Sequence, residues 1–224
     1  LPDFRGNEGF WKAYPPYAHL GLRFAELANP RWFRVKPTLA WGFYGHRLNL
    51  YRATVPHGGF ALLKRWGERA PLGYGVVTSN IDGHFQRAGF DPRRVVEIHG
   101  TIDWLQCLAG CGVGIFSAEP VAPIIDEATM HAARPLPMCP RCGALARPNV
   151  LMFGDFDWDD ARTHRRQLAF ARWIQQISER DRSPRIAIIE CGAGTAIPSI
   201  RHTSESLVDQ YGGTLIRINP REPE

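Results

Sequence analysis

The sequence of 224 residues predicts an α/β fold in which a doubly wound parallel sheet carries a smaller, inserted zinc-ribbon module. Two observations predict this fold. Short apolar runs rich in β-branched residues alternate with longer segments of helical periodicity, as they do where helices cover a parallel sheet. The stretch 101–148 interrupts this alternation, is rich in Gly and Pro, and contains four cysteines in two close pairs.

Four apolar runs predict the strands, because each is short, nearly continuous in apolar residues, and ends at Asn, Gly or another polar residue. They span residues 74–80, 94–100, 185–192 and 214–219. Helical periodicity predicts helices at residues 37–53, 58–70, 158–181 and 200–212. This alternation favours an open sheet covered by helices, and such a sheet binds ligands at the carboxyl ends of its strands.

The cysteine pairs predict a zinc site. Cys107 and Cys111 are separated by three residues, Cys139 and Cys142 by two, and 27 residues lie between the pairs. Zinc favours four tetrahedral thiolates, and a site closed by four of them is structural rather than catalytic. Metal-binding thiols, in place of a disulfide framework, favour a reducing, cytoplasmic setting. Cys191 stands apart from the pairs, and we expect it to be a small buried residue at the end of a core strand.

The composition, with 44% hydrophobic and 22% charged residues, is that of an ordinary globular protein. No apolar run approaches the roughly 20 residues that cross a bilayer, so we expect no membrane partner. The net charge is +5, but the basic residues are scattered along the chain, which indicates a solvated surface rather than a nucleic-acid interface. The alternative of a non-catalytic zinc-ribbon module on DNA or RNA would predict a steeply salt-dependent affinity.

Polar side chains lie where two of the predicted strands end. Asn80 and Asp82 follow one strand, and His99 lies at the end of the next. We expect the three to converge on one ligand, and histidine has the pKa best suited to proton transfer near neutral pH. Each also has a structural interpretation, since Asn and Asp close turns and a lone His is often structural. Gly192 and Gly194 predict a backbone turn that a phosphate or ribose can approach closely.

The chain contains, in order, the motifs LPDFRGNEGFW, TSNIDGHFQRAG, EIHG, the two cysteine pairs, RPNVLMFGD, ECGAGTAIP and INP. This series resembles the motifs of the sirtuins, the NAD-dependent protein lysine deacylases, and points to a bacterial-type member. LPDFRGNEGFW resembles the second half of the family signature GAGxSxxSGIPDFRGxxGLW, and TSNIDGHFQRAG resembles TQNIDxLHxxAG. EIHG, RPNVLMFGD, ECGAGTAIP and INP are similar to the family's ELHG, RPxVVxFGE, GTSLxVxP and IN motifs, and the cysteine pairs resemble its zinc ribbon. The resemblance spans nearly the whole chain in the family's order.

The resemblance implies two domains that enclose a cleft. Residues 1–100 and 149–224 would form a Rossmann-like NAD-binding domain, with residues from about 10 to 60 adding a helical part to the small domain, and residues 101–148 would form the zinc ribbon. NAD and an acyl-lysine protein or peptide would enter the cleft from opposite sides. The products would be free lysine, nicotinamide and O-acyl-ADP-ribose.

The resemblance also implies roles by position. His99 would be the general base that deprotonates a ribose hydroxyl, while Asn80 and Asp82 would orient the nicotinamide ribose and carboxamide. Further NAD contacts would come from Asp3, Phe4 and Arg5, in a loop that closes over NAD and excludes water, and from Ile81, Gly192, Gly194 and Asn219. The peptide would pair through its backbone along Val150, Phe153 and Gly154.

Tyr44 and Arg47 lie three residues apart and would share one face of a helix. They fall where one branch of the family places a Tyr and an Arg that bind the carboxylate of succinyl- or malonyl-lysine, and a guanidinium suits that carboxylate. The resemblance therefore implies desuccinylation or demalonylation beside deacetylation. The alternative is that Tyr44 only packs and that Arg47 is a surface residue.

Several positions depart from the family pattern. Ser79 replaces the usual Gln, His84 and Phe85 replace Leu-His, and Gly-Ala-Gly replaces Gly-Thr-Ser near Gly194. These changes fall on the NAD side of the predicted site. They leave open an NAD glycohydrolase or a mono-ADP-ribosyltransferase on the same fold.

Overall fold

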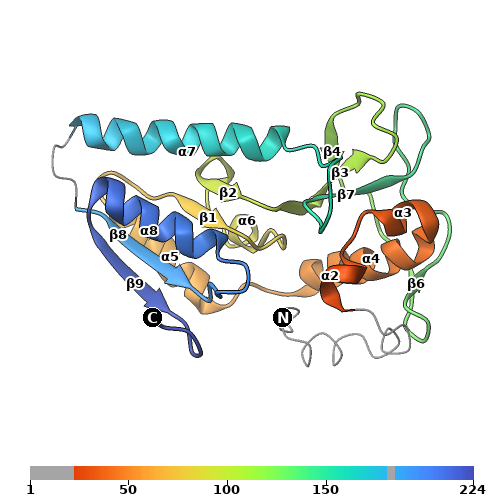
Figure 1. Ribbon diagram of the computed structural model, residues 1–224, viewed down its shortest axis with the longest axis horizontal. Coiled ribbons are helices and arrows are strands. Elements are labelled where there is room, and N and C mark those ends of the chain that lie inside the picture. The colour runs from red at the N-terminus through yellow and green to blue at the C-terminus, as the bar shows by residue number, and fades with distance from the viewer. Residues whose placement is uncertain (1–22, 181–184) are drawn as a thin grey trace.

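The computed structural model describes residues 23–180 and 185–224, which form two lobes side by side along the long axis of the molecule (Figure 1). One lobe contains the parallel strands with the helices that cover them. The other contains the cysteine module and the helices within residues 24–53. The expected α/β fold with an inserted module is confirmed.

The parallel strands are the four apolar runs of the sequence. β1 (Val76–Thr78) pairs with β2 (Val95–Glu97), and β8 (Ala187–Cys191) pairs with β9 (Thr214–Ile218). Among the described residues, the hydrogen bonds of these strands form two parallel pairs in place of one continuous ladder. β1 and β2 are only three residues long each, so few of their backbone groups could hydrogen-bond to a further strand.

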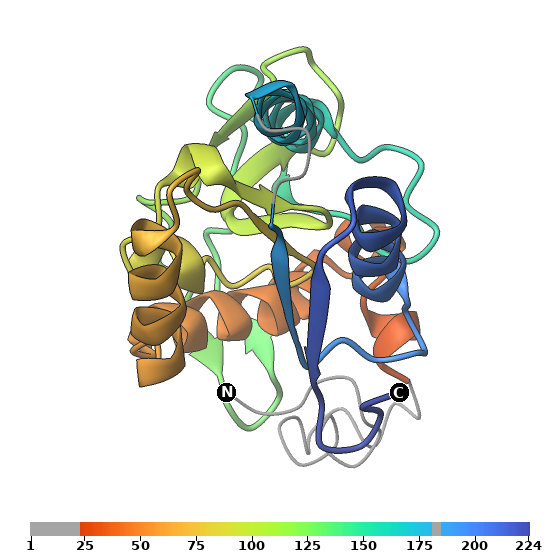
Figure 2. The same ribbon diagram turned by 90° about the vertical axis from the view of Figure 1, so that its left-hand side faces the viewer.

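Three helices cover these strands. α7 (Ala161–Arg180) packs on β2, and α8 (Ser199–Tyr211) packs on β8 and β9. Figure 2 shows β8 and β9 side by side, with α8 on one side of them and α5 (Gly58–Arg69) on the other. Short turns of helix, α6 (His84–Arg87) and η2 (Pro92–Arg94), lie between β1 and β2 in the sequence. The helix bounds agree with the predicted ones to within three residues.

The second lobe is built on α4 (Pro37–Ala53), whose bounds are those predicted from the sequence. It follows α2 (Phe24–Leu27) and α3 (Arg31–Val35). The antiparallel sheet of this lobe has the order β4–β3–β7, from β4 (Ile115–Ser117), β3 (Gly100–Cys107) and β7 (Ala146–Val150). A small hairpin pairs β5 (Ile125–Asp126) with β6 (His131–Ala132).

The main hydrophobic core lies between α4 and this sheet. α4 is buried on most of its circumference, as expected of a helix that is apolar nearly all round. The indole nitrogen of Trp41 donates to the carbonyl of Ala146 at 2.9 Å, which ties the helix to β7. Gly42 packs directly on the backbone of Met130, where a Cβ would lie 1.9 Å from the carbonyl oxygen. Full burial of each large apolar side chain contributes roughly 1.5–3 kcal/mol, so this core fixes the second lobe.

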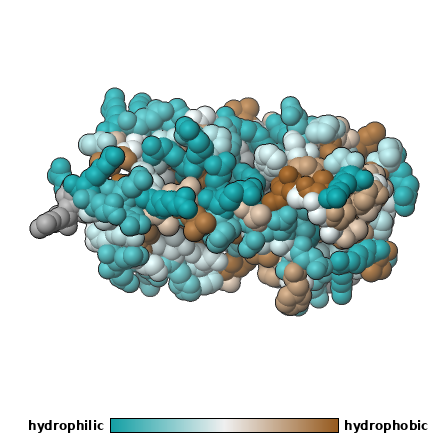
Figure 3. All heavy atoms as spheres, turned by 90° about the horizontal axis from the view of Figure 1, so that it is seen from above, coloured by the Kyte–Doolittle hydropathy of each residue, from teal (hydrophilic) through white to brown (hydrophobic). Residues whose placement is uncertain are grey.

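The surface over α7 is mainly hydrophilic, with smaller hydrophobic patches elsewhere on the same face (Figure 3). In the described part of the chain, no helix combines the length and the apolar character needed to cross a bilayer.

Candidate active site and metal centre

Two neighbouring segments carry the polar residues predicted at the strand ends. The parallel pairing of β1 and β2 continues beyond the strands, because the amide of Ile98 donates to the carbonyl of Thr78 at 2.9 Å. Further on, the carbonyl of Ile81 accepts from the amide of Ile102 at 3.0 Å and from the hydroxyl of Thr101 at 3.3 Å. Residues 78–82 and 98–102 therefore run side by side, with His99 between the two points of attachment.

Asp82 is buried and closes the turn that starts α6. Its Oδ1 accepts from the amide of His84 at 3.0 Å, and its carbonyl accepts from Arg87 at 2.5 Å. The same Arg87 makes an ion pair with Asp103 of β3 at 3.2 Å and donates to the carbonyl of Tyr51 in α4 at 3.0 Å. The turn-closing interpretation of Asp82 is thus correct as a description of its local structure, and Arg87 anchors this turn to the other lobe.

Asn80 is exposed at the same strand end, and its amide donates to the hydroxyl of Thr78 at 3.1 Å. His99 is half-buried, and its carbonyl accepts from the amide of Leu151 at 3.0 Å. Gly100 follows with a φ of +72°, and a Cβ there would lie 2.1 Å from the carbonyl oxygen of Asn149. Only glycine fits this conformation and this close contact. The contact joins the start of β3, directly after His99, to β7.

The segment predicted to bind the peptide extends from β7 at the junction of the lobes. Val150 is buried, whereas Phe153 and Gly154 are exposed. The amide of Phe153 donates to the carbonyl of Ala28 at 3.0 Å, which ties this segment to the helices of the second lobe. The structure thus places the predicted peptide residues next to the strand that follows His99, because Gly100 pairs with Val150.

The predicted adenosine end lies at the carboxyl ends of β8 and β9. The amide of Gly192 donates to the carbonyl of Ile218 at 2.9 Å, and the side-chain amide of Asn219 donates to the carbonyl of Ala193 at 3.0 Å. Gly192 has a φ of +66°, and a Cβ there would meet no atom within 4 Å, so the turn offers open backbone. Gly194 belongs to the same turn. Asp3, Phe4 and Arg5 lie outside the described residues.

Cys191 is exposed, so the prediction that it is buried is wrong. Successive side chains of a strand point to opposite faces. Glu190 takes the inward position and forms an ion pair with Arg217 of β9, which turns Cys191 outward. Although the residue as a whole is exposed, partial burial of its thiol raises the pKa of Cys191, and the neighbouring carboxylate of Glu190 raises it further.

Tyr44 and Arg47 share the inner face of α4, and both are buried. Burial raises the pKa of Tyr44 well above its usual range, so the phenol stays protonated. Arg47 is only 7% exposed, so the alternative that it is a surface residue is wrong. Its Nε and Nη2 donate to the hydroxyl of Tyr51 at 2.9 Å and 2.6 Å.

The four paired cysteines form a metal centre. The sulfur of Cys107 lies 3.6 Å from that of Cys142, and the sulfur of Cys111 lies 3.6 Å from that of Cys139. All four ligand atoms lie within 4.8 Å of one another. Sulfurs placed 2.3 Å from a tetrahedral zinc ion would be about 3.8 Å apart, so the cluster fits a structural zinc ion closed by four thiolates.

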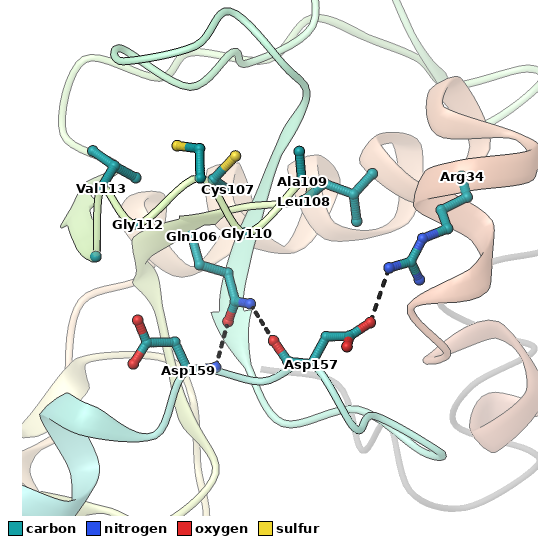
Figure 4. Close-up of a pocket in the computed structure, with 12 residues that line it drawn as sticks. Arg34, Gln106, Cys107, Leu108, Ala109, Gly110, Gly112, Val113, Asp157 and Asp159 are labelled. Atoms are coloured by element: carbon teal, nitrogen blue, oxygen red, sulfur yellow. Dashed lines mark hydrogen bonds and ion pairs between the residues drawn. The ribbon is translucent and has the colours of Figure 1, made fainter.

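A pocket of about 320 Å³ lies beside the metal centre (Figure 4). Residues 107–114 of the first cysteine loop line one side. On the other side, Gln106 donates to the carbonyl of Asp157 at 2.8 Å and accepts from the amide of Asp159 at 3.1 Å, and Arg34 bridges to Asp157 at 2.9 Å. None of the predicted catalytic residues lines this pocket, so it is separate from the strand-end site.

Sequence reasoning missed the residues that connect the parts of the site. Arg87 and Tyr51 join the Asp82 turn to α4, and their hydrogen bond spans 36 positions of the sequence. The sequence does not predict this contact, because helical and strand periodicity indicate only which residues are neighbours within one element. The one available signal was that Arg87 belongs to the TSNIDGHFQRAG motif.

Comparisons with known proteins agree with this architecture. The sequence model of the Sir2 family matches residues 1–174. The chain is 28% identical over 222 residues to the NAD-dependent protein deacylase of Aquifex aeolicus (strain VF5), covering 99% of this chain and 78% of that protein. It is 32% identical over 225 residues to NAD-dependent protein deacylase 1 of Archaeoglobus fulgidus, covering 99% and 76%.

Solved structures show the same relationship. A crystal structure of a Sir2 homologue in complex with NAD superposes with a TM-score of 0.70 at 29% identity, covering 99% of this chain and 73% of that one. A mutant of Sir2 homologues in complex with 2′-O-acetyl ADP ribose gives a TM-score of 0.67 at 29% identity, covering 99% and 75%. Family model, relatives and structures all cover most of the chain, and the chain therefore belongs to the Sir2 family.

Proposed function

We propose that the protein is an NAD-dependent protein lysine deacylase. The relatives that cover nearly the whole chain carry this name, and structural relatives at 29% identity bind NAD and an acetylated ADP-ribose. The observation that carries the proposal is the side-by-side course of residues 78–82 and 98–102. It gathers Asn80, Asp82 and His99 at one strand end, beside the segment that would hold the peptide.

In the proposed reaction, the acyl oxygen of the substrate attaches to the ribose carbon that carries nicotinamide, and the bond to nicotinamide breaks. A ribose hydroxyl then attacks the acyl carbon, with one water molecule consumed overall, and free lysine leaves. His99 would accept the proton of that hydroxyl, as a half-buried imidazole can near neutral pH. Asp82 would orient the nicotinamide end, because the amide of His84 holds its carboxylate in a fixed direction.

The remaining NAD contacts follow the strand ends. The open backbone turn of Gly192 and Gly194 and the side chain of Asn219 would hold the adenosine end, and Ile81 would line the nicotinamide end. The turn fits a nucleotide because its glycine backbone leaves room for close approach. Closure of the site by Asp3, Phe4 and Arg5 remains a prediction from the family motif.

The peptide would add as an extended strand next to Val150, Phe153 and Gly154, with backbone hydrogen bonds to both lobes. The tie between Phe153 and Ala28 supports this, since it holds the segment at the junction of the lobes. The pairing of Gly100 with Val150 closes the cysteine module at its base and supports a module of about residues 101–148 between the two parts of the NAD domain. The five free cysteines suit a reducing, cytoplasmic setting.

We also propose that the enzyme accepts acyl groups that end in a carboxylate, such as succinyl and malonyl. The support is the pair on α4: the protonated phenol of Tyr44 and the buried guanidinium of Arg47 offer a donor and a charge to a carboxylate.

The test follows all products at once. The protein is incubated with NAD and matched acetyl, propionyl, malonyl and succinyl peptides, and mass spectrometry follows peptide, nicotinamide and O-acyl-ADP-ribose. We expect the three to change in step, and we expect His99→Ala to abolish deacylation while some nicotinamide release remains. Nicotinamide that appears with free ADP-ribose or an ADP-ribosylated protein, while the peptides stay acylated, would refute the deacylase and indicate a glycohydrolase or a transferase.

A further inference from the structure

The guanidinium of Arg47 is held inside an aromatic cage. It lies over the rings of Phe24, Phe43 and Tyr51, at 5.6, 5.2 and 5.5 Å from their centroids. Arginine stacks well on such ring faces, and burial strengthens the attraction. The cage restricts the position of the guanidinium, but it does not by itself fix the rotation of the group.

The hydroxyl of Tyr51 constrains this rotation. Its oxygen accepts from both Nε and Nη2 of Arg47, at 2.9 and 2.6 Å. These two donors form one edge of the guanidinium, so a single oxygen engages the whole edge. Hydrogen bonds from a charged donor are stronger than those between neutral groups, and this contact is almost fully buried. The contact therefore restrains the orientation of the guanidinium.

Tyr51 also touches the opposite end of the predicted site. Its carbonyl accepts from Nη1 of Arg87 at 3.0 Å and lies 3.3 Å from Nε2 of His84, on the turn that carries Asp82. One residue of α4 thus contacts Arg47 through its side chain and the Asp82 turn through its backbone. The position of the guanidinium is linked in this way to the nicotinamide end of the site.

We propose that Tyr51 is a specificity-determining residue that positions Arg47 for the carboxylate of acidic acyl groups. The proposal rests on the deacylase function and on the acyl preference proposed above. With its Nε–Nη2 edge held by the hydroxyl, the guanidinium is oriented before a substrate binds, which lowers the ordering cost of binding. An acetyl group has no carboxylate and gains nothing from this arrangement.

The test is Tyr51→Phe, which removes only the hydroxyl and keeps the ring over Arg47 and the carbonyl that meets Arg87. We expect the ratio of kcat/KM for a succinyl peptide to that for the matched acetyl peptide to fall about tenfold or more, because the variant removes both hydrogen bonds of the charged guanidinium to the hydroxyl. The loss should lie in the KM of the succinyl peptide, because a misaligned Arg47 weakens binding and leaves His99 in place.

Tyr74→Phe is the matched control. The hydroxyl of Tyr74 also accepts a hydrogen bond, from the amide of Asp91 at 3.1 Å, and its ring also carries an arginine, Arg94 at 5.4 Å, outside the proposed site. This variant should lose comparable packing and keep the ratio of the wild-type protein. Equal unfolding midpoints of the two variants would show that the change in ratio is not a loss of fold.

The variant Arg47→Met distinguishes the role of Tyr51 from the acyl preference on which it rests. If it abolishes the preference for the succinyl peptide while Tyr51→Phe leaves the ratio intact, the role of Tyr51 is overturned and the acyl preference stands. If Arg47→Met leaves the ratio unchanged, or if the wild-type protein processes only the acetyl peptide, the acyl preference is overturned together with the role of Tyr51. A deacetylase activity that persists in either case leaves the deacylase function itself intact.

Discussion

The buried ion pair between Arg147 and Asp155 holds the segment proposed to bind the peptide, and its removal should destabilise the protein strongly. Two contacts, from Nη1 to Oδ2 at 2.7 Å and from Nη2 to Oδ1 at 3.0 Å, join the guanidinium to the carboxylate. The side chains are 1% and 0% exposed. The pair closes the turn that leads out of β7, so Val150 and Phe153 lie within the loop that it secures.

The structure sets the expected size of the effect. Removing one partner of a buried ion pair typically costs about 3–5 kcal/mol, because the other charge stays buried without compensation. In Arg147→Met, the carboxylate of Asp155 would keep two long hydrogen bonds, from the amides of Met152 and Asp157, both at 3.3 Å. These bonds offset part of the penalty, so we expect a loss near the lower end of the range, about 3 kcal/mol.

Urea unfolding followed by circular dichroism measures this loss. The matched control is Arg34→Met, because Arg34 pairs with Asp157 in the same region but the side chains are 51% and 68% exposed. Exposed pairs contribute about 0–1 kcal/mol, so this variant should differ little from the wild-type protein. A cost for Arg147→Met no larger than that for Arg34→Met would refute the reasoning.

A double variant tests the cause of the loss. Arg147→Met combined with Asp155→Leu removes both charges, so no unpaired carboxylate stays in the interior. We expect the double variant to be more stable than Arg147→Met alone by about 1 kcal/mol or more. A double variant that is less stable than the single one would show that packing, and not the buried charge, accounts for the loss.

Three further predictions follow from the geometry. Purified protein should contain one zinc ion per chain, and a strong chelator should lower its unfolding temperature; metal content far below one would count against the ribbon. Gly100→Ala should lower stability and deacylation, because its Cβ would lie 2.1 Å from the carbonyl oxygen of Asn149. The control Gly143→Ala, with a φ of +70° but open space around the Cβ, should cost only the backbone strain. Equal losses in both variants would be inconsistent with a role for the contact. The amide and hydroxyl of Thr195 hold the pKa of Glu222 below its usual range. The contribution of Glu222 to stability should therefore be present above the unfolded pKa and be lost as the pH falls through the lower, folded pKa. Glu222→Gln should remove this part of the pH dependence of stability, and an unchanged profile would contradict the prediction.

The helices and parallel strands could be predicted because their signals are local. α4 begins at Pro37 and ends at Ala53, as predicted, with proline in the first turn where its missing N–H costs nothing. α7 begins at Ala161, three residues later than predicted, because the carboxylate of Asp159 accepts the amide of Ala161 at 3.1 Å before the helix starts. The metal centre was predictable for the same reason, since its ligands come as two short spacings.

The direction and burial of single side chains could not be predicted in the same way. The burial of Arg47 follows from no charge pattern. Phe43 and Tyr51 are its neighbours four residues away on α4, but Phe24 of α2 meets Arg47 only in the fold. Cys191 lies on the outward face because Glu190, on the inward face, forms an ion pair with Arg217 of the neighbouring strand, 27 positions away. Side-chain positions of this kind depend on tertiary contacts, which the periodicity of a sequence does not predict.

The departure from the family motif at His84 and Phe85 has a structural explanation. His84 is buried, and its ring meets the rings of Tyr51 and Phe60 edge-on, at centroid distances of 6.4 and 6.1 Å. Phe85 packs on Phe60 at 5.0 Å and on Phe90 at 5.1 Å. The aromatic cluster packs α6, the helical turn that follows Asp82, against Phe60 and Phe90, and the imidazole adds a polar contact toward α4 that a leucine would not make. These substitutions therefore stabilise the turn that carries the proposed nicotinamide contacts, and they give no support to a glycohydrolase or transferase over a deacylase.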